Sequence, residues 1–460
     1  MSLFDRVVAE AVLVATIILF LCNFIFGCYL FRSCSAMGPG EFQSMNVQVL
    51  TLCLVLGLSN LVAADDWPQF LGPGGSAVSA EQVPDQWDSR HNLVWKSDLP
   101  GAGSSSPIIV GQRVLVTCYS QAGDALTRFV VCLDKASGKT LWSKAFPATY
   151  REDAYRGYIQ EHGYASNTPA SDGQHLYVFF GKGGVHALDL EGNILWSVDV
   201  GRESSSRQWG SASSLLLYQD MVIVNAAEES QAIIALDKAT GKERWRQEAA
   251  MLELTYGTPR LVTSEGGNTE VVISVPGEIW GLSPENGELN WFASTPMTGN
   301  VSPSVVVEDG TLYSFGGYRS SGSISVRAGG DGDVSRSHVN WTGRATSYVA
   351  TPLLHAGRFY WIDDRGLANC IQASNGEVVY RQRVSGLTGR PVYASPVMIG
   401  GKIYVVTRRG GTIVYPPGET FGPIAVNKIE GDDSDFNASP AVADSRLYLR
   451  SNQALYCIGN

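Results

Sequence analysis

The sequence has few of the groups from which enzyme sites are usually built. Its six histidines are scattered and none lies at the spacing of a metal-binding pair, and no Gly-x-Ser-x-Gly nucleophile motif occurs. Gly138-Lys139-Thr140 is similar to the end of a phosphate-binding loop, but Leu133 stands where that loop needs its first glycine. His186 likewise replaces the last glycine of a dinucleotide-binding motif. We therefore expect no catalytic and no metal-binding residue.

The chain also lacks the excess positive charge of a nucleic-acid-binding protein. It has 34 Lys and Arg residues against 44 Asp and Glu residues, a net charge of -10, so we expect no nucleic-acid partner. Asp331-Gly332-Asp333 offers two carboxylates but not the further ligands that a calcium loop needs, and we interpret it as a solvated turn.

Charged residues are nearly absent from the hydrophobic leader, residues 1–64. Residues 7–31 are long enough to span a bilayer and contain Glu10 as their only charge. A second apolar segment, residues 45–64, ends in Val-Ala-Ala, as signal peptides do before cleavage. Either the first segment anchors the chain in the inner membrane, or translation starts at Met37 or Met45 and the second segment is removed. Both alternatives export the remainder, so we expect a periplasmic or cell-envelope protein.

What the sequence does contain is a repeated pattern of short strands. Its clearest copy, residues 167–196, has a Thr-Pro opening, three apolar segments separated by turns, and a closing tryptophan. The opening occurs eight times, at intervals of 44 to 62 residues. The eight openings are Ser106-Pro107, Thr168-Pro169, Ser214-Leu215, Thr258-Pro259, Ser302-Pro303, Thr351-Pro352, Ser395-Pro396 and Ser439-Pro440. Such a period, with four short strands per unit, is typical of propeller blades.

The two ends of the repeat region complete each other. An isolated strand signal, residues 92–96, precedes the first repeat, whereas the last repeat, residues 438–458, has room for only three strands. We therefore predict an all-β fold: residues 92–460 form an eight-bladed β-propeller of four-stranded antiparallel blades, closed by an N-terminal strand that completes the C-terminal blade. Residues 65–91, rich in Trp, Phe and Pro at their start, are expected to form an ordered arm packed on the propeller.

Cysteines in the repeats read as small core residues. Cys132, Cys370 and Cys457 share one repeat position, where other repeats have Ala or Gly, so we predict that they are buried. Cys118 would face Cys132 across a hairpin centred near Asp124, and a disulfide between them stays open in an oxidising compartment.

The repeat resembles that of the pyrroloquinoline-quinone-type (PQQ-like) propeller family. Its Ser-Pro, Gly-x-x-Tyr-Val and Ala-Leu-Asp-x-x-Thr-Gly-Lys-x-x-Trp elements are clearest in residues 394–406, 235–245 and 132–142, and the likeness covers residues 92–460. The segments DWPQFLGP, EHGYASNTP and DDSDFNASP are similar to those of exported planctomycete proteins of this kind.

This resemblance implies one of two functional classes. Quinoprotein dehydrogenases of the fold hold PQQ and calcium, whereas other members are non-catalytic scaffolds, such as the outer-membrane barrel-assembly lipoprotein. Quinoprotein alcohol dehydrogenases usually carry two adjacent cysteines beside the cofactor and are longer, but no two cysteines are adjacent here. We therefore expect a non-catalytic binding or scaffold propeller without cofactor. A PQQ- and calcium-dependent oxidoreductase, and the extracytoplasmic sensor domain of a membrane-anchored protein, stay open as alternatives.

Propeller topology predicts where a ligand would bind. Loops that enter the innermost strand and loops that join the second and third strands lie on one face, around the channel mouth. Aromatic and charged side chains there would suit an envelope protein, a peptide or a glycan; the alternative is that the rings only wedge between blades. The longest entry loop, residues 146–166, would cover the mouth. The predicted ligand-binding residues are Tyr164, His162, Trp209, Glu228, Tyr256, Tyr348, Arg365, Tyr393, Arg408, Arg409 and Phe436.

Overall fold

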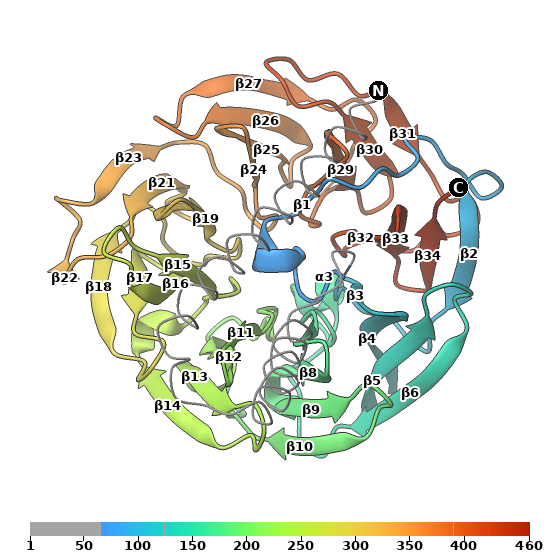
Figure 1. Cartoon of the computed structure of the whole chain (residues 1–460), viewed down its shortest axis with the longest axis horizontal. Coiled ribbons are helices and arrows are strands. Elements are labelled where there is room, and N and C mark those ends of the chain that lie inside the picture. The colour runs from blue at the N-terminus through green and yellow to red at the C-terminus, as the bar shows by residue number, and fades with distance from the viewer. Residues whose placement is uncertain (1–65, 124, 390) are drawn as a thin grey trace, which may run out of the picture. The chain divides into compact units, whose positions relative to one another are not determined.

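Eight small antiparallel sheets follow one another around a central channel (Figure 1). The computed structural model describes residues 66–123, 125–389 and 391–460, and both apolar segments of the leader lie outside these residues. In this part of the chain no helix has the length and apolar character that a membrane span requires. The predicted all-β, eight-bladed propeller is confirmed.

Each blade has four strands, numbered from the channel outwards. Blade 1 consists of β3 (Ile108–Val110), β4 (Arg113–Ala122), β5 (Ala125–Asp134) and β6 (Thr140–Pro147), and blade 2 of β7 (Ala170–Ser171), β8 (His175–Phe179), β9 (Val185–Asp189) and β10 (Ile194–Val198). Blade 3 consists of β11 (Leu216–Tyr218), β12 (Met221–Ala226), β13 (Ala232–Asp237) and β14 (Glu243–Glu248), and blade 4 of β15 (Arg260–Thr263), β16 (Thr269–Val275), β17 (Glu278–Leu282) and β18 (Leu289–Ser294). Blade 5 consists of β19 (Val306–Glu308), β20 (Thr311–Gly316), β21 (Gly322–Arg327) and β23 (Val339–Gly343), and blade 6 of β24 (Leu353–His355), β25 (Arg358–Ile362), β26 (Leu367–Gln372) and β27 (Val378–Arg383). Blade 7 consists of β28 (Val397–Ile399), β29 (Lys402–Val406), β30 (Thr412–Tyr415) and β31 (Ala425–Asn427), and blade 8 of β32 (Ala441–Ala443), β33 (Arg446–Arg450), β34 (Ala454–Ile458) and β2 (Leu93–Asp98).

Blade 8 joins the two ends of the described chain, as expected. Strand β2 pairs antiparallel with β34, with Leu93 opposite Ile458 and Trp95 opposite Cys457. The guanidinium of Arg450 is buried between blades 8 and 1. There it donates to the Ser105 carbonyl (2.9 Å) and to the Cys118 sulfur (3.4 Å). These contacts close the ring between its last and first blades.

In five blades the tryptophan that closes the repeat fastens its blade to the next one. The indole N–H of Trp95, in blade 8, donates to the Lys135 carbonyl of blade 1 (3.1 Å), and its ring lies over Gly138 in the same turn. A Cβ at Gly138 would come within 2.5 Å of the indole, and this residue also has a φ of +70°, so the position requires glycine. The same indole-to-turn hydrogen bond is made from Trp142, Trp196, Trp245 and Trp341 to the following blade.

Residues 66–91 run from the channel to the rim. Strand β1 (Val78–Ser79) pairs parallel with innermost strand β28, and a short 3-10 helix, η1 (Pro73–Gly75), lies over the centre of the ring (Figure 1). Asp85 then binds Lys402, and Trp87 lies against Tyr404 before the chain enters β2.

Two local predictions need correction. Cys118 does not face Cys132. In the register of the β4–β5 hairpin, Cys118 is paired with Phe129 and Cys132 is paired with Leu115, and both cysteines are free thiols. The segment at Asp331 is not simply a turn, since Gly332–Asp333 form β22, which pairs parallel with the outer edge of blade 4. Cys132, Cys370 and Cys457 are fully buried, as predicted.

The fifth repeat also differs from its expected opening. The serine equivalent to those of the other repeats is Ser304 rather than Ser302, as the hydrogen bonds of the channel wall show.

Candidate functional site

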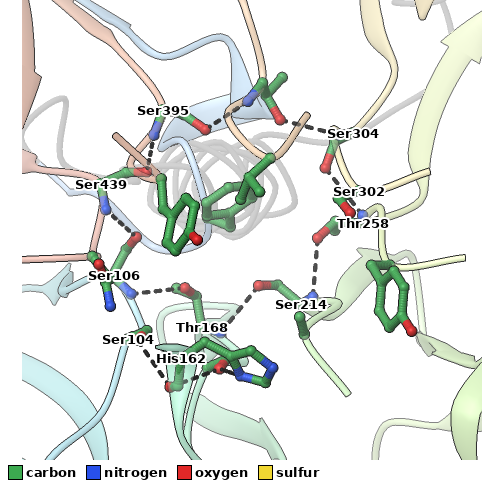
Figure 2. A pocket seen from close by; sticks show the side chains of 18 of the residues that line it. Ser104, Ser106, His162, Thr168, Ser214, Thr258, Ser302, Ser304, Ser395 and Ser439 are labelled. Carbon is green, nitrogen blue, oxygen red and sulfur yellow. Dashed lines mark hydrogen bonds between the residues drawn. The ribbon is translucent and has the colours of Figure 1, made fainter. Parts of the chain in front are cut away.

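A closed belt of hydroxyl groups surrounds the channel where the innermost strands begin (Figure 2). In each blade a backbone N–H donates to the side-chain oxygen of the equivalent Ser or Thr in the following blade, at 2.9 to 3.1 Å. Blade 8 bonds to blade 1 in the same way, so the belt has no gap. Its members are Ser106, Thr168, Ser214, Thr258, Ser304, Thr351, Ser395 and Ser439.

This belt forms the wall of a chamber of about 160 Å³. By volume alone the chamber has room for roughly 11 to 16 water molecules, at about 10–15 Å³ each. Each belt oxygen accepts one backbone N–H, which leaves its hydroxyl proton and one lone pair for other partners. Side-chain amides of Asn300 and Asn437 also line the chamber. The remaining wall is largely aromatic, from Phe70, Tyr158, Trp209, Tyr256, Tyr348 and Tyr393.

The arm closes the channel at the end opposite the entry loops. The Trp67 backbone forms an antiparallel bridge with Ile109 in β3, and the Pro68 carbonyl accepts the N–H of Ser171 in β7. Arg260 of β15 donates to the Gly75 carbonyl. The arm thus contacts innermost strands on several sides of the channel, and its Phe70 side chain reaches the chamber. A ligand entering from the entry-loop face meets a floor rather than an open pore.

The long entry loop, residues 146–166, spans part of the mouth, as the sequence predicts. Its Tyr158 ring lies 4.5 Å from the ring of Trp209 in blade 3 and 6.0 Å from that of Tyr348 in blade 6. Helix α3 (Ile159–His162) fixes this position, because the His162 Nε2–H donates to the Trp209 carbonyl (2.9 Å) and the Asn437 amide donates to the Glu161 carbonyl (2.6 Å). The mouth is therefore narrowed by an aromatic side chain that touches both sides.

The chamber wall carries almost no net charge. Glu161 is its one carboxylate and is paired with Arg408 at 2.6 Å, while Arg408 also binds Asp435. Burial lowers the pKa of His162, so this imidazole is neutral at physiological pH. Its Nδ1 accepts from the Ser166 hydroxyl (2.6 Å), since Nε2 carries the proton.

The described residues do not fit PQQ with calcium at this place. PQQ is a polycarboxylate and would need cationic side chains, but no Lys or Arg belongs to the chamber wall. Residues 66–123, 125–389 and 391–460 also contain no group of three or more His, Cys, Asp or Glu residues arranged to hold a metal ion. Hydroxyl, amide and aromatic groups instead suit a neutral ligand.

A second, small cavity of about 20 Å³ lies beside the chamber, between blades 1, 2 and 3. Two ion pairs line it: Arg128 with Glu152 (2.5 Å) and Lys182 with Asp153 (3.0 Å). Two further carboxyls, those of Glu228 and Glu229 in helix α4 (Ala227–Ser230), have no cation of their own.

The two glutamates of the second cavity keep their protons to a higher pH than ordinary carboxyls do. Burial raises the pKa of Glu228 to about 7, and burial together with the neighbouring Glu228 raises that of Glu229 to about 8. Glu228 accepts a hydrogen bond from the Ser205 hydroxyl (2.7 Å), but one oxygen of each glutamate has no hydrogen-bond partner.

The predicted ligand-binding residues divide into two groups. His162, Trp209, Tyr256, Tyr348 and Tyr393 line the chamber together, which the topological argument predicted. The other six lie elsewhere: Tyr164 packs on Tyr119, Glu228 is buried, Arg365 binds Asp363, Arg408 lies over the Tyr393 ring, Arg409 binds Asp435 and Phe436 stacks on Tyr456. Their role in binding stays a prediction.

Sequence reasoning missed two parts of the site. The belt residues were identified as strand openings but not as a ring of hydroxyls, and their shared Ser or Thr was the available signal. Phe70 comes from the arm, where no repeat defines a position, whereas Tyr158 belongs to the inserted loop that was expected over the mouth.

Comparison with known proteins gives one consistent family. Residues 127–381 match the family model described as "Outer membrane protein assembly factor BamB". A protein of that name from Shewanella oneidensis is 24% identical over 339 residues, covering 69% of this chain and 76% of the relative. The protein of that name from Yersinia pestis is 24% identical over 285 residues, or 61% and 68% of the two chains.

A solved structure shows the same fold. The crystal structure of BamB from Moraxella catarrhalis superposes with a TM-score of 0.56 at 16% identity, covering 79% of this chain and 96% of that one.

Proposed function

Because this chain belongs to the PQQ-like propeller family of the outer membrane protein assembly factor BamB, we propose that it is a non-catalytic scaffold of the cell envelope. It is exported, and it binds another envelope protein through the entry-loop face. The relatives carry the name of an assembly factor, and the charge-poor chamber wall has none of the cations that PQQ requires.

The observation that carries this proposal is the structure of the mouth. The inserted loop is held across it by bonds to blades 3, 7 and 8, through Trp209, Arg408 and Asn437. Tyr155 in this fixed loop is 45% exposed, and Tyr318, whose ring lies 6.1 Å from that of Tyr348, is 56% exposed. Exposed aromatic rings on a rigid support bind partners at a small cost in conformational entropy.

Site-specific cross-linking tests the proposal in the cells that make the protein. A photo-reactive residue replaces Tyr155 or Tyr318 at the mouth, and, as the matched control, Val378, which is 58% exposed on the outer strand β27. We expect the two mouth positions to cross-link the same envelope protein, identified by mass spectrometry, and Val378 not to. Equal labelling at all three positions, or none at the mouth, contradicts a docking face there.

The alternatives are tested separately. Titration of the protein with PQQ and calcium, followed by cofactor absorbance and dye reduction with simple alcohols, should give no stoichiometric binding; turnover would establish an oxidoreductase. The sensor alternative depends on residues 7–31, and mass spectrometry of the mature N-terminus decides whether they are retained.

A further inference from the structure

We infer that the chamber is a binding site for the uncharged end of a glycan, one terminal sugar residue at a time. The site lies beneath the mouth, but the argument uses the chamber's own chemistry and does not depend on a protein partner at the rim. Shape, charge and the kinds of polar group each restrict the ligand.

The floor restricts the ligand to an end or a side group. Because the arm from Trp67 to Gly75 crosses the channel and Phe70 faces the chamber, no chain can thread through. A polymer can enter only with its terminus or with one side group.

Charge then separates glycans from peptides. A peptide terminus carries a carboxylate or an ammonium group, and placing such a charge in a site without a counter-charge is costly. The carboxylate of Glu161 is already paired with Arg408, and His162 is neutral. A neutral terminal sugar has no such charge to bury.

The polar groups match a polyol. Sugar hydroxyls both donate and accept, and each belt hydroxyl has one proton and one lone pair left after accepting its neighbour's N–H. The amides of Asn300 and Asn437 add donors and acceptors of the same kind. Eight equivalent hydroxyls around a circle also tolerate several orientations of a ring.

The aromatic groups supply the apolar contact that a pyranose face needs. The rings of Trp209 and Tyr348 both lie against the ring of Tyr158, and all three line the chamber from entry loops that precede the belt positions, so the rings form a collar above the belt. The C–H groups of a sugar pack on the aromatic face, whereas the sugar hydroxyls lie around the edge of the pyranose ring. A terminal sugar that enters from the mouth would therefore meet the aromatic collar first and the hydroxyl belt second.

The test is a titration of the full-length protein with defined probes. Chitotetraose and maltotetraose are the neutral glycans, tetragalacturonate is the charged glycan, and an acetylated tetrapeptide with a free C-terminal carboxylate is the peptide. Calorimetry gives the affinity, and saturation-transfer NMR shows which sugar residue contacts the protein. We expect at least one neutral glycan to bind with contacts concentrated on its terminal residue, and the two charged probes to bind at least about tenfold more weakly.

Variants connect the binding to the chamber. Trp209→Ala and Tyr348→Ala should each weaken glycan binding about tenfold, the loss of one aromatic contact, whereas Tyr348→Phe should keep it. Val378→Ala is the control, since this side chain is 58% exposed on the outer strand β27 and lies outside the chamber wall. Circular dichroism confirms that each variant is folded.

Three results would overturn the inference: no binding of any neutral glycan, equal or stronger binding of tetragalacturonate or the peptide, or unchanged affinity in Trp209→Ala and Tyr348→Ala. None of them bears on the cross-linking at Tyr155 and Tyr318. The glycan site and the scaffold function therefore fail or hold separately.

Discussion

The buried pair Glu228 and Glu229 makes the stability of this propeller depend on pH in an unusual direction. Both carboxyls lie in the small cavity beside the chamber, where Arg128 and Lys182 are already paired with other acids. Their raised pKa values mean that the folded protein holds protons which the unfolded chain has released. We therefore predict that Glu229→Gln, which is neutral at every pH, stabilises the protein at alkaline pH.

The size of the effect follows from the pKa. Glu229 titrates at about 8 in the folded protein against 4.5 in its ordinary state. The contribution of Glu229 to stability is fully present below pH 4.5, where both states are protonated, and is lost as the pH rises from 4.5 to 8, because only the unfolded chain releases this proton there. At about 1.4 kcal/mol per pKa unit, the advantage of Glu229→Gln should grow by about 4 kcal/mol between pH 5 and pH 9.

Urea unfolding at pH 5, 7 and 9 measures this advantage, because urea, unlike guanidinium, does not screen charges. Glu253→Gln is the matched control. The Glu253 carboxylate accepts the Ser206 N–H (2.7 Å), which lowers its pKa, so its stabilising contribution is present above the ordinary pKa and is lost as the pH falls through the lowered one. Glu253→Gln should therefore destabilise equally at all three pH values. If Glu229→Gln gains nothing on going from pH 5 to pH 9, Glu229 is ionised in the folded protein and a counter-charge occupies the cavity.

Two further predictions concern the channel wall and its support. Ser395→Ala removes the acceptor of the buried Thr351 N–H and should lower the free energy of unfolding by about 1–3 kcal/mol. Ser395→Thr keeps a hydroxyl of the kind that other belt positions use and should lower it much less. Equal decreases in the urea midpoints of the two variants would contradict the role of the belt. Cys118 is fully buried, and burial raises the pKa of its thiol, so maleimide should label it only at the rate of unfolding; rapid labelling of the native protein would show an open blade interface.

The architecture was predictable because each blade repeats local signals. Turn glycines, apolar strands and a closing tryptophan recur with one period, and the structure shows why they recur together: the indole of Trp95 packs on Gly138 of the next blade. The unpaired strand at 92–96 could be assigned to blade 8 because a closed ring leaves no other place for it. By contrast, the Cys118 and Cys132 pairing failed because the hairpin register is not visible in the spacing of two residues.

The site was predictable only in part, because its side chains come from several blades and from the inserted loop. Topology placed Trp209, Tyr256, Tyr348 and Tyr393 at one mouth correctly, since every entry loop must lead there. It could not show that Glu228 is buried, because this depends on the fold of the inserted loop, whose Asp153 binds Lys182 beside it.

The inserted loop and the arm change the surroundings and the charge pairing of the side chains that the repeats contribute. From the repeats alone, aromatic and charged side chains were expected to share an open funnel. Instead, Arg408 pairs with Glu161 from the loop and with Asp435, so its charge is balanced outside the chamber wall, while Phe70 from the arm closes the floor. What remains accessible is the one feature that every blade shares, its belt hydroxyl, together with aromatic faces. A propeller scaffold thereby acquires a closed, neutral chamber, and selectivity for an uncharged terminus follows from the pairing of its charges rather than from any single recognition residue.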